Sequence, residues 1–89
     1  MARFLVLTTF TSHEARMEHR AVHREYLYAL VDQGKILMAG PYEDESGGLI
    51  IFEAESEQEV RDLVANDPFT TGGVFATTEI RPWKLVAGR

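Results

Sequence analysis

The sequence has no cysteine among its 89 residues. This absence excludes disulfide scaffolds, thiolate metal sites and cysteine nucleophiles. The chain also lacks a run of lysine and arginine, and its 14 acidic and 9 basic residues give a formal net charge of -5. Proteins that bind nucleic acid use basic surfaces to neutralise phosphates, so this class of function is excluded as well.

Long hydrophobic runs are missing too, since no apolar segment approaches the roughly 20 residues that span a bilayer. The start of the chain, MARFLVLTTF, has neither the length nor the cleavage site of a signal peptide. There is no G-x-S-x-G motif and no glycine-rich phosphate loop between a strand and a helix. We therefore expect a cytoplasmic protein with no membrane segment, no nucleotide cofactor and no nucleophilic serine.

The length and composition of the chain predict a single small globular domain over residues 1–89. The sequence is 45% hydrophobic and 26% charged, which is ordinary for a soluble domain. A chain of this size buries only about 60–65% of its unfolded surface. Because a lone copy would have modest stability, we expect a homodimer.

Hydrophobic patterning predicts four strands, over residues 3–10, 35–41, 49–55 and 74–85. The acidic segment 42–48 between the second and third strands is predicted to be an exposed turn. Residues 69–73 are predicted to be a loop.

Two helices are predicted between these strands. Thr11 and Glu14 have the spacing of a capping box, which predicts a helix that ends near Gln33 with Gly34 as its stop. Ser56 and Glu59 form a second capping box, and the helix that it opens must end before Pro68. The residues predicted to form the buried stripe of the first helix are Val22, Tyr26, Leu27, Leu30 and Val31.

The resulting order, βαββαβ, predicts an α+β fold of the ferredoxin-like type. In that fold a four-stranded antiparallel sheet carries two helices on one face. The opposite face would be bare, and pairing with the sheet of a second copy is the usual way to cover it. This fold hosts many unrelated functions, so function has to be argued from individual residues.

The three histidines are the first candidates for chemistry. His19 and His23 are four residues apart, a spacing that metal ligands on one helix face use. A two-histidine site would still need a third ligand, and HRAVH lacks the glutamate of an H-E-x-x-H motif, so we expect no metal site. His23 also borders the predicted buried stripe, where it could simply be a half-buried histidine bonded to a backbone carbonyl.

Asp67 gives His23 a second interpretation. It stands in the segment NDPF, where the second helix must end, and could be an ordinary turn or cap residue. With antiparallel helices, the end of the second helix approaches the first half of the first helix, so a carboxylate at Asp67 could reach His23. It would fix the tautomer of the imidazole and favour its charged form. A histidine oriented by a carboxylate is a basic unit of general acid–base catalysis.

Four segments in order carry a family resemblance: RAVHREYLYAL, GKILMAGP, LVANDPF and EIRPW. Over residues 3–84 they make the chain similar to the YciI-like, or YCII-related, family of small ferredoxin-like proteins, called DGPF-like at superfamily level. The resemblance implies a dimeric α+β barrel with a His–Asp pair at His23 and Asp67. It also implies pocket or substrate-binding positions, which fall on Arg20, Gly40, Pro41 and Phe69.

The resemblance implies chemistry as well. Members with an assigned activity tend towards breakdown of aromatic compounds, including dehydrochlorination of chlorinated hydroxyquinols, and muconolactone isomerases share the fold. We therefore expect proton transfer without a cofactor, by isomerisation or elimination, on a small aromatic, lactone or acid. In this interpretation His23 moves the proton, Asp67 orients His23, and Arg20 holds a carboxylate or phenolate oxygen.

Several alternatives stay open at this stage. Arg20 could be a solvated helix residue, and Tyr42 could donate a phenolic proton or be an exposed turn residue. Phe69 and Trp83 are more typical of core or dimer contacts than of platforms for a substrate ring. The whole domain could be a binding or accessory module for a small ligand without catalysis, or a structural dimer in which His23 is a satisfied core group.

Overall fold

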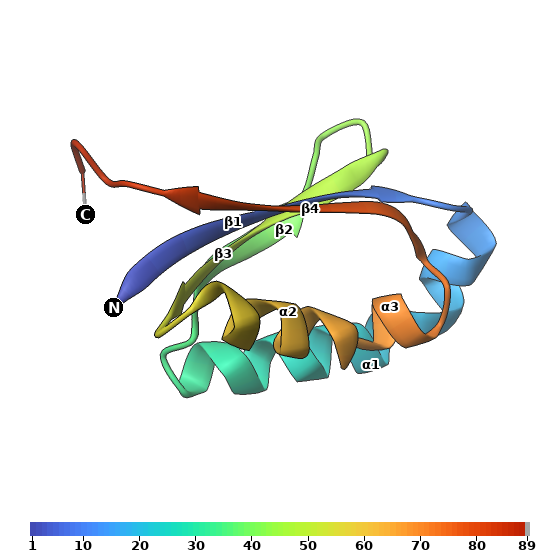
Figure 1. Ribbon diagram of the computed structural model, residues 1–89. Helices are drawn as coiled ribbons and strands as arrows, with labels where there is room; N and C mark the ends of the chain where they lie inside the picture. Colours follow the sequence, from blue (N-terminus) through green and yellow to red (C-terminus); the bar gives the residue numbers. More distant parts are fainter. Residues whose placement is uncertain (89) are drawn as a thin grey trace.

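Four antiparallel strands form one sheet in the computed structural model, which describes residues 1–88. They are β1 (Ala2–Phe10), β2 (Ile36–Pro41), β3 (Gly47–Ala54) and β4 (Phe75–Trp83), and they lie in the order β2-β3-β1-β4. The helices α1 (His13–Asp32), α2 (Glu57–Ala65) and α3 (Pro68–Thr71) cover one face of this sheet (Figure 1). The predicted ferredoxin-like βαββαβ arrangement is confirmed. Within residues 1–88, no helix combines the length and the apolar character needed to cross a membrane.

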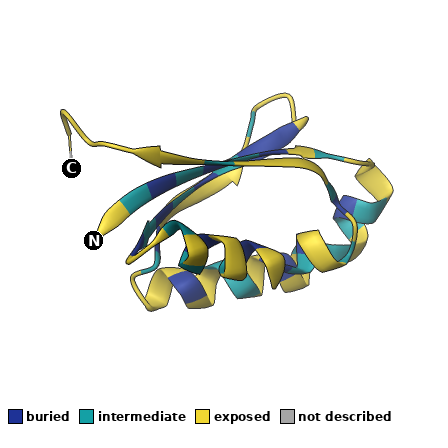
Figure 2. Ribbon diagram, viewed as in Figure 1, coloured by how far each residue is buried: buried dark blue, intermediate teal, exposed yellow. Residues whose placement is uncertain are grey.

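The hydrophobic core lies between the sheet and the helices. Alternate residues of β1 and β3 point into it, as the period of two in a half-buried strand requires, and Figure 2 shows buried segments on the inner side of both layers. α1 and α2 contribute their apolar faces. The buried apolar residues of this cluster are Phe4, Val6, Leu30, Ile36, Ile50, Phe52, Ala54, Val60 and Val64.

The ends of α1 follow from local hydrogen bonds. At its end Gly34 adopts a left-handed φ of 76°, which glycine tolerates, and its N–H donates to the Val31 carbonyl. At its start the predicted capping residue is wrong by one position. Ser12 caps the helix by accepting from the Ala15 N–H at 3.1 Å, whereas the Thr11 hydroxyl donates to the Gly73 carbonyl. Thr11 lies one residue before the cap, and its N–H donates to the Val74 carbonyl, next to β4.

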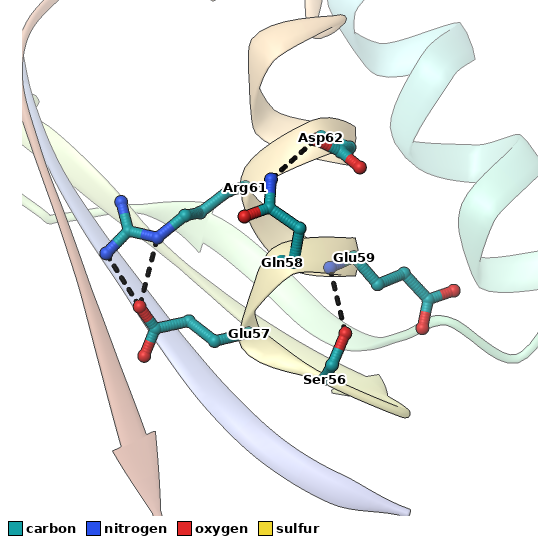
Figure 3. A network of polar contacts seen from close by, with 6 residues as sticks. All are labelled: Ser56, Glu57, Gln58, Glu59, Arg61 and Asp62. Carbon is teal, nitrogen blue, oxygen red and sulfur yellow. Dashed lines mark hydrogen bonds and ion pairs between the residues drawn. The ribbon is translucent and has the colours of Figure 1, made fainter.

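The predicted N-cap of α2 at Ser56 is confirmed (Figure 3), whereas the return bond of the capping box reaches Glu55, one residue before the cap. Ser56 Oγ accepts from the Glu59 N–H at 3.2 Å. The Glu59 carboxylate reaches back and accepts from the Glu55 N–H at 2.9 Å. An exposed ion pair one turn apart joins Arg61 and Glu57 at 2.6 Å. The first turn of α2 is therefore stabilised by hydrogen bonds and an ion pair between residues that are close in the sequence.

Most element ends differ by one or two residues from the sequence prediction, and β4 ends at Trp83 instead of residue 85, but two differences concern the nature of a segment. Gly47 and Gly48, predicted to end an exposed turn, are buried residues of β3 and pair with Thr9 and Thr8. Segment 69–73, predicted to be a loop, begins with the short helix α3. Asp67 as its N-cap and Pro68 at its first position are residues that favour a helix start.

The predicted buried stripe of α1 is partly wrong. Val22 and Val31 are 56% and 45% exposed, whereas His23 and Leu30 lie against the sheet. The buried face of the helix is centred between these two residues, and Val22 and Val31 stand about 80–100° away from it on either side. Arg16 continues the buried face toward the start of the helix, an assignment that hydrophobicity alone would not make.

The sheet face opposite the helices carries a patch of apolar side chains. These alternate with the core residues along β1 and β3, and Met38 of β2 pairs beside Ile51. Met38 is exposed and the others are partly so. We call this set the open sheet face: Leu5, Leu7, Met38, Leu49 and Ile51.

Candidate active site

His23 and Asp67, predicted from the sequence to approach one another, lie in direct contact. His23 is in the middle of α1, and Asp67 lies between α2 and α3. His23 Nδ1 is 2.7 Å from Asp67 Oδ1. Both side chains are buried, and Asp67 is only 1% exposed. Two polar groups that the sequence separates by 44 residues therefore form a hydrogen-bonded pair inside the protein.

Asp67 is held in place by the start of α3. Its Oδ1 also accepts the Phe69 N–H at 2.9 Å, which is the N-cap bond of this helix. Pro68 occupies the first helical position, where its missing N–H costs nothing. The aspartate is thus a cap residue and the partner of His23 at once, so the two interpretations that the sequence left open are both satisfied.

The contact with Asp67 fixes the state of the imidazole. An ionised carboxylate can only accept hydrogen bonds, so His23 Nδ1 must carry a proton and donate it. In the neutral ring Nε2 then has a free lone pair. Because Asp67 takes Nδ1 and His23 lines a pocket, Nε2 is the nitrogen left for a bound molecule.

Aromatic rings restrict the orientation of the imidazole. Phe69 stacks on His23 with ring centroids 3.6 Å apart and planes within 2° of parallel. Phe75 meets the same ring edge-on, with centroids 6.3 Å apart. Such packing removes rotational freedom from the imidazole before any ligand arrives.

The burial of this region also acts on Tyr26, whose hydroxyl donates to the Leu63 carbonyl at 2.6 Å. Burial, and to a smaller degree the negative charge of Asp67, raises the pKa of Tyr26. The phenol is therefore neutral at physiological pH and acts as a structural donor beside the pair.

A pocket of about 240 Å³ opens beside His23, between α1 and strands β2 and β3. Its apolar walls include Leu27, Ile50 and Phe75. Of the residues that the sequence proposed for substrate binding, four line this pocket and one does not. Arg20, Gly40, Pro41 and Phe69 line it, whereas Tyr42 lies outside its lining and its N–H donates to Gly47.

The structure adds two arginines that the sequence analysis missed. Arg16 and Arg24 line the pocket on either side of Arg20 along α1. Arg16 is buried and donates to the Glu45 carboxylate at 2.7 Å. That hydrogen bond and the charge of Arg16, with smaller contributions from His13 and Arg20, hold the pKa of Glu45 below its usual value. The repeat of arginine every four residues was visible in the sequence and could have identified them.

His19 does not join His23 in a metal site. Its Nδ1 lies 2.9 Å from the Ala15 carbonyl, and its ring packs on Gly72, where an added Cβ would come within 2.5 Å of it. His19 is half-buried, because α3 packs against α1 there. Among residues 1–88, no group of three or more histidines and carboxylates is arranged to hold a metal ion.

The sequence is similar to those of a known domain family and of several bacterial proteins. Residues 2–84 match the YCII-related domain. Protein YjpA of Bacillus subtilis strain 168 is 35% identical over 85 residues, which cover 96% of this chain and 98% of that protein. Protein YciI of Escherichia coli O6:H1 is 29% identical over 83 residues, which cover 82% and 85% of the two chains.

One solved structure is similar along nearly the whole length. It is the 5-chloro-2-hydroxyhydroquinone dehydrochlorinase TftG of Burkholderia phenoliruptrix AC1100, in complex with 2,5-dihydroxybenzoquinone. Its chain is 35% identical to this one, with a TM-score of 0.78 and coverage of 92% of this chain and 93% of that chain. The similarity in sequence and in fold therefore covers the region that carries the pocket and the His–Asp pair.

Proposed function

This chain belongs to the YCII-related domain family, and we propose that it is a small enzyme that transfers protons without a cofactor. The single observation that carries the proposal is the 2.7 Å contact between His23 Nδ1 and Asp67 beside the pocket. It leaves Nε2 free to accept a proton from a bound molecule and to return it. Asp67 orients the ring and stabilises the imidazolium that forms.

We propose a small hydroxylated ring as the substrate and an elimination or isomerisation as the reaction. TftG, the similar solved structure, is a dehydrochlorinase that acts on a chlorinated hydroxyquinol. In such an elimination, a proton moves from one ring hydroxyl to the carbon that carries chlorine. A second hydroxyl then loses its proton and its electrons form a carbonyl, the ring double bond at that carbon shifts to the chlorinated carbon, and chloride leaves with the electron pair of the C–Cl bond. Both steps need one group that accepts and returns protons, which is the role assigned to His23.

The test is turnover by the wild-type protein. 5-Chloro-2-hydroxyhydroquinone is the first substrate to assay, followed by other hydroxylated aromatics and lactones. Released chloride and the quinone absorbance measure elimination, and exchange of ring or α protons in deuterated water measures isomerisation. Turnover that depends on His23 supports the proposal. Tight binding without turnover on any of them contradicts it and identifies a binding module instead.

We also propose that the protein is a cytoplasmic homodimer formed through the open sheet face. Leu5, Leu7 and Ile51 are partly exposed at the centre of this face, where a second sheet would cover them. Sedimentation equilibrium should therefore give a mass twice the 10.1 kDa of the chain. In Leu7→Glu the mass should fall toward that of one chain, because a charge would be buried in the interface. A monomeric wild type at micromolar concentration would contradict the dimer.

A further inference from the structure

Three arginines form a column along the pocket side of α1. Arg16, Arg20 and Arg24 are spaced by four residues, so their Cβ atoms follow one another at about 5–6 Å, and all three line the same pocket as His23. Like charges at this spacing destabilise a helix. A chain with a net charge of -5 has thus gathered three of its nine basic residues on one wall, which favours an electrostatic role for that wall.

The three arginines are not equivalent. Arg16 is already neutralised, because it is 4% exposed, donates to Glu45 and lies with its guanidinium carbon 4.8 Å from the centre of the Phe10 ring. Arg20 and Arg24 have no carboxylate within ion-pair distance among residues 1–88. The pocket therefore presents two guanidinium groups that form no ion pair within residues 1–88.

We propose that the pocket binds its substrate as an anion, with the charged group on Arg20 and Arg24 and the reacting position at His23. This inference rests on the proposed function for the identity of the site. The apolar walls at Leu27 and Ile50 suit a planar ring, and two guanidinium groups suit a carboxylate or an ionised ring oxygen. The substrate class is a hydroxylated ring with one acidic group.

Glu45 limits the number of negative charges that the pocket accepts. It stands in the turn between β2 and β3 with a φ of 58°, a conformation that non-glycine residues rarely adopt. Its carboxylate pairs with Arg16 and remains 61% exposed. Because this internal carboxylate occupies Arg16, only Arg20 and Arg24 remain to pair with negative charge on the substrate.

The experiment compares two ligands that differ only in charge. 3,4-Dihydroxybenzoate is ionised at pH 7, and 3,4-dihydroxybenzamide is its neutral counterpart of the same shape. Calorimetric titration of wild-type protein should give an affinity for the benzoate at least about 10-fold higher than for the amide, as charge-assisted hydrogen bonds imply. Titration with 2,5-dihydroxybenzoquinone, an acidic hydroxyquinone, shows whether an ionised ring oxygen is bound as well as a carboxylate.

Two variants should act in opposite directions. Arg20→Gln removes one of the free charges and should weaken benzoate binding about 5- to 10-fold while leaving amide binding unchanged. Glu45→Gln releases Arg16 and should strengthen benzoate binding several-fold. Arg61→Gln is the matched control, since Arg61 is an exposed arginine of α2 outside the pocket lining, paired with Glu57.

Equal affinities for the benzoate and the amide, or an equal loss of both in Arg20→Gln, would overturn the inference. The outcome does not depend on turnover, because His23→Gln protein should keep the preference for the benzoate. Charge selectivity without turnover would therefore refute only the proposed reaction. Turnover of neutral phenols without charge selectivity would refute only the anion site.

Discussion

Replacement of His23 by glutamine should abolish catalysis and leave the fold intact. The expected loss in kcat/KM is about 100- to 10,000-fold, the usual contribution of a positioned general base. Glutamine can still donate its amide to Asp67 and can pack on Phe69, so the buried carboxylate keeps a partner. Circular dichroism and thermal unfolding of the variant should therefore stay near those of wild type, and the kinetic assay measures the loss of chemistry alone.

His19→Gln is the matched control for this experiment. His19 lies one turn earlier on α1, is half-buried and bonds the Ala15 carbonyl, but it is not among the residues that line the pocket. Its replacement should change kcat/KM by less than a factor of about 3, since its contacts, with Ala15 and Gly72, lie outside the pocket. If both variants lose activity equally, or if His23→Gln retains it, His23 is not the proton-transfer group.

The second large effect is expected at Gly47, in the region where β1 and β3 pair. A Cβ on this residue would stand 1.8 Å from the Thr8 carbonyl oxygen, and that atom belongs to the backbone and cannot rotate away. Gly47→Ala should therefore lower the free energy of unfolding by at least about 3 kcal/mol. This is a large part of the stability of a small domain, so urea denaturation should show a much earlier midpoint or no folded baseline.

Gly40→Ala is the control for stability. Gly40 lies in β2, and a Cβ added there meets nothing within 4 Å. The substitution should leave the urea midpoint unchanged or slightly raised, because alanine reduces the entropy of the unfolded chain. Equal midpoints for Gly47→Ala and wild type would contradict the described register of β1 and β3.

Most elements of this fold could be predicted because their signals are local. Strand alternation, Ser56 as a helix cap and Gly34 as a helix stop each act within a few residues, and the structure contains all three. The short helix α3 was missed although its signal was local too. The sequence Asp67–Pro68 predicts the end of one helix, but the same two residues equally favour the start of another, which is what they form here.

The candidate site also has a part that the sequence could predict and a part that it could not. That His23 and Asp67 could meet followed from the antiparallel packing of two helices, a feature of the fold class. The stacking of Phe69 on His23 and the edge contact from Phe75 depend on where α3 and β4 settle against α1, which no local pattern gives. The arginine column is not visible as a run of consecutive basic residues, because a helix brings together residues four apart.

The buried stripe of α1 shows a further limit of hydrophobicity as a guide. Val22 and Val31 looked like core residues and are exposed, whereas Arg16 and His23 are buried and polar. The protein tolerates these polar residues because each has a hydrogen-bond partner, Glu45 for Arg16 and Asp67 for His23. A sequence read for apolar spacing alone therefore assigns the wrong residues to the face that carries the chemistry.

The most direct test of the central claim is the tautomer of His23, measured by long-range ¹H–¹⁵N correlation of the imidazole nitrogens. The spectrum is recorded well above the ordinary histidine pKa of about 6.5, so that the rings are neutral. The account predicts that His23 carries its proton on Nδ1, in slow exchange with water, with Nε2 unprotonated, while exposed His13 exchanges rapidly. A proton on His23 Nε2, with Nδ1 bare, would mean that Asp67 does not hold the ring, and the proposed base would not exist.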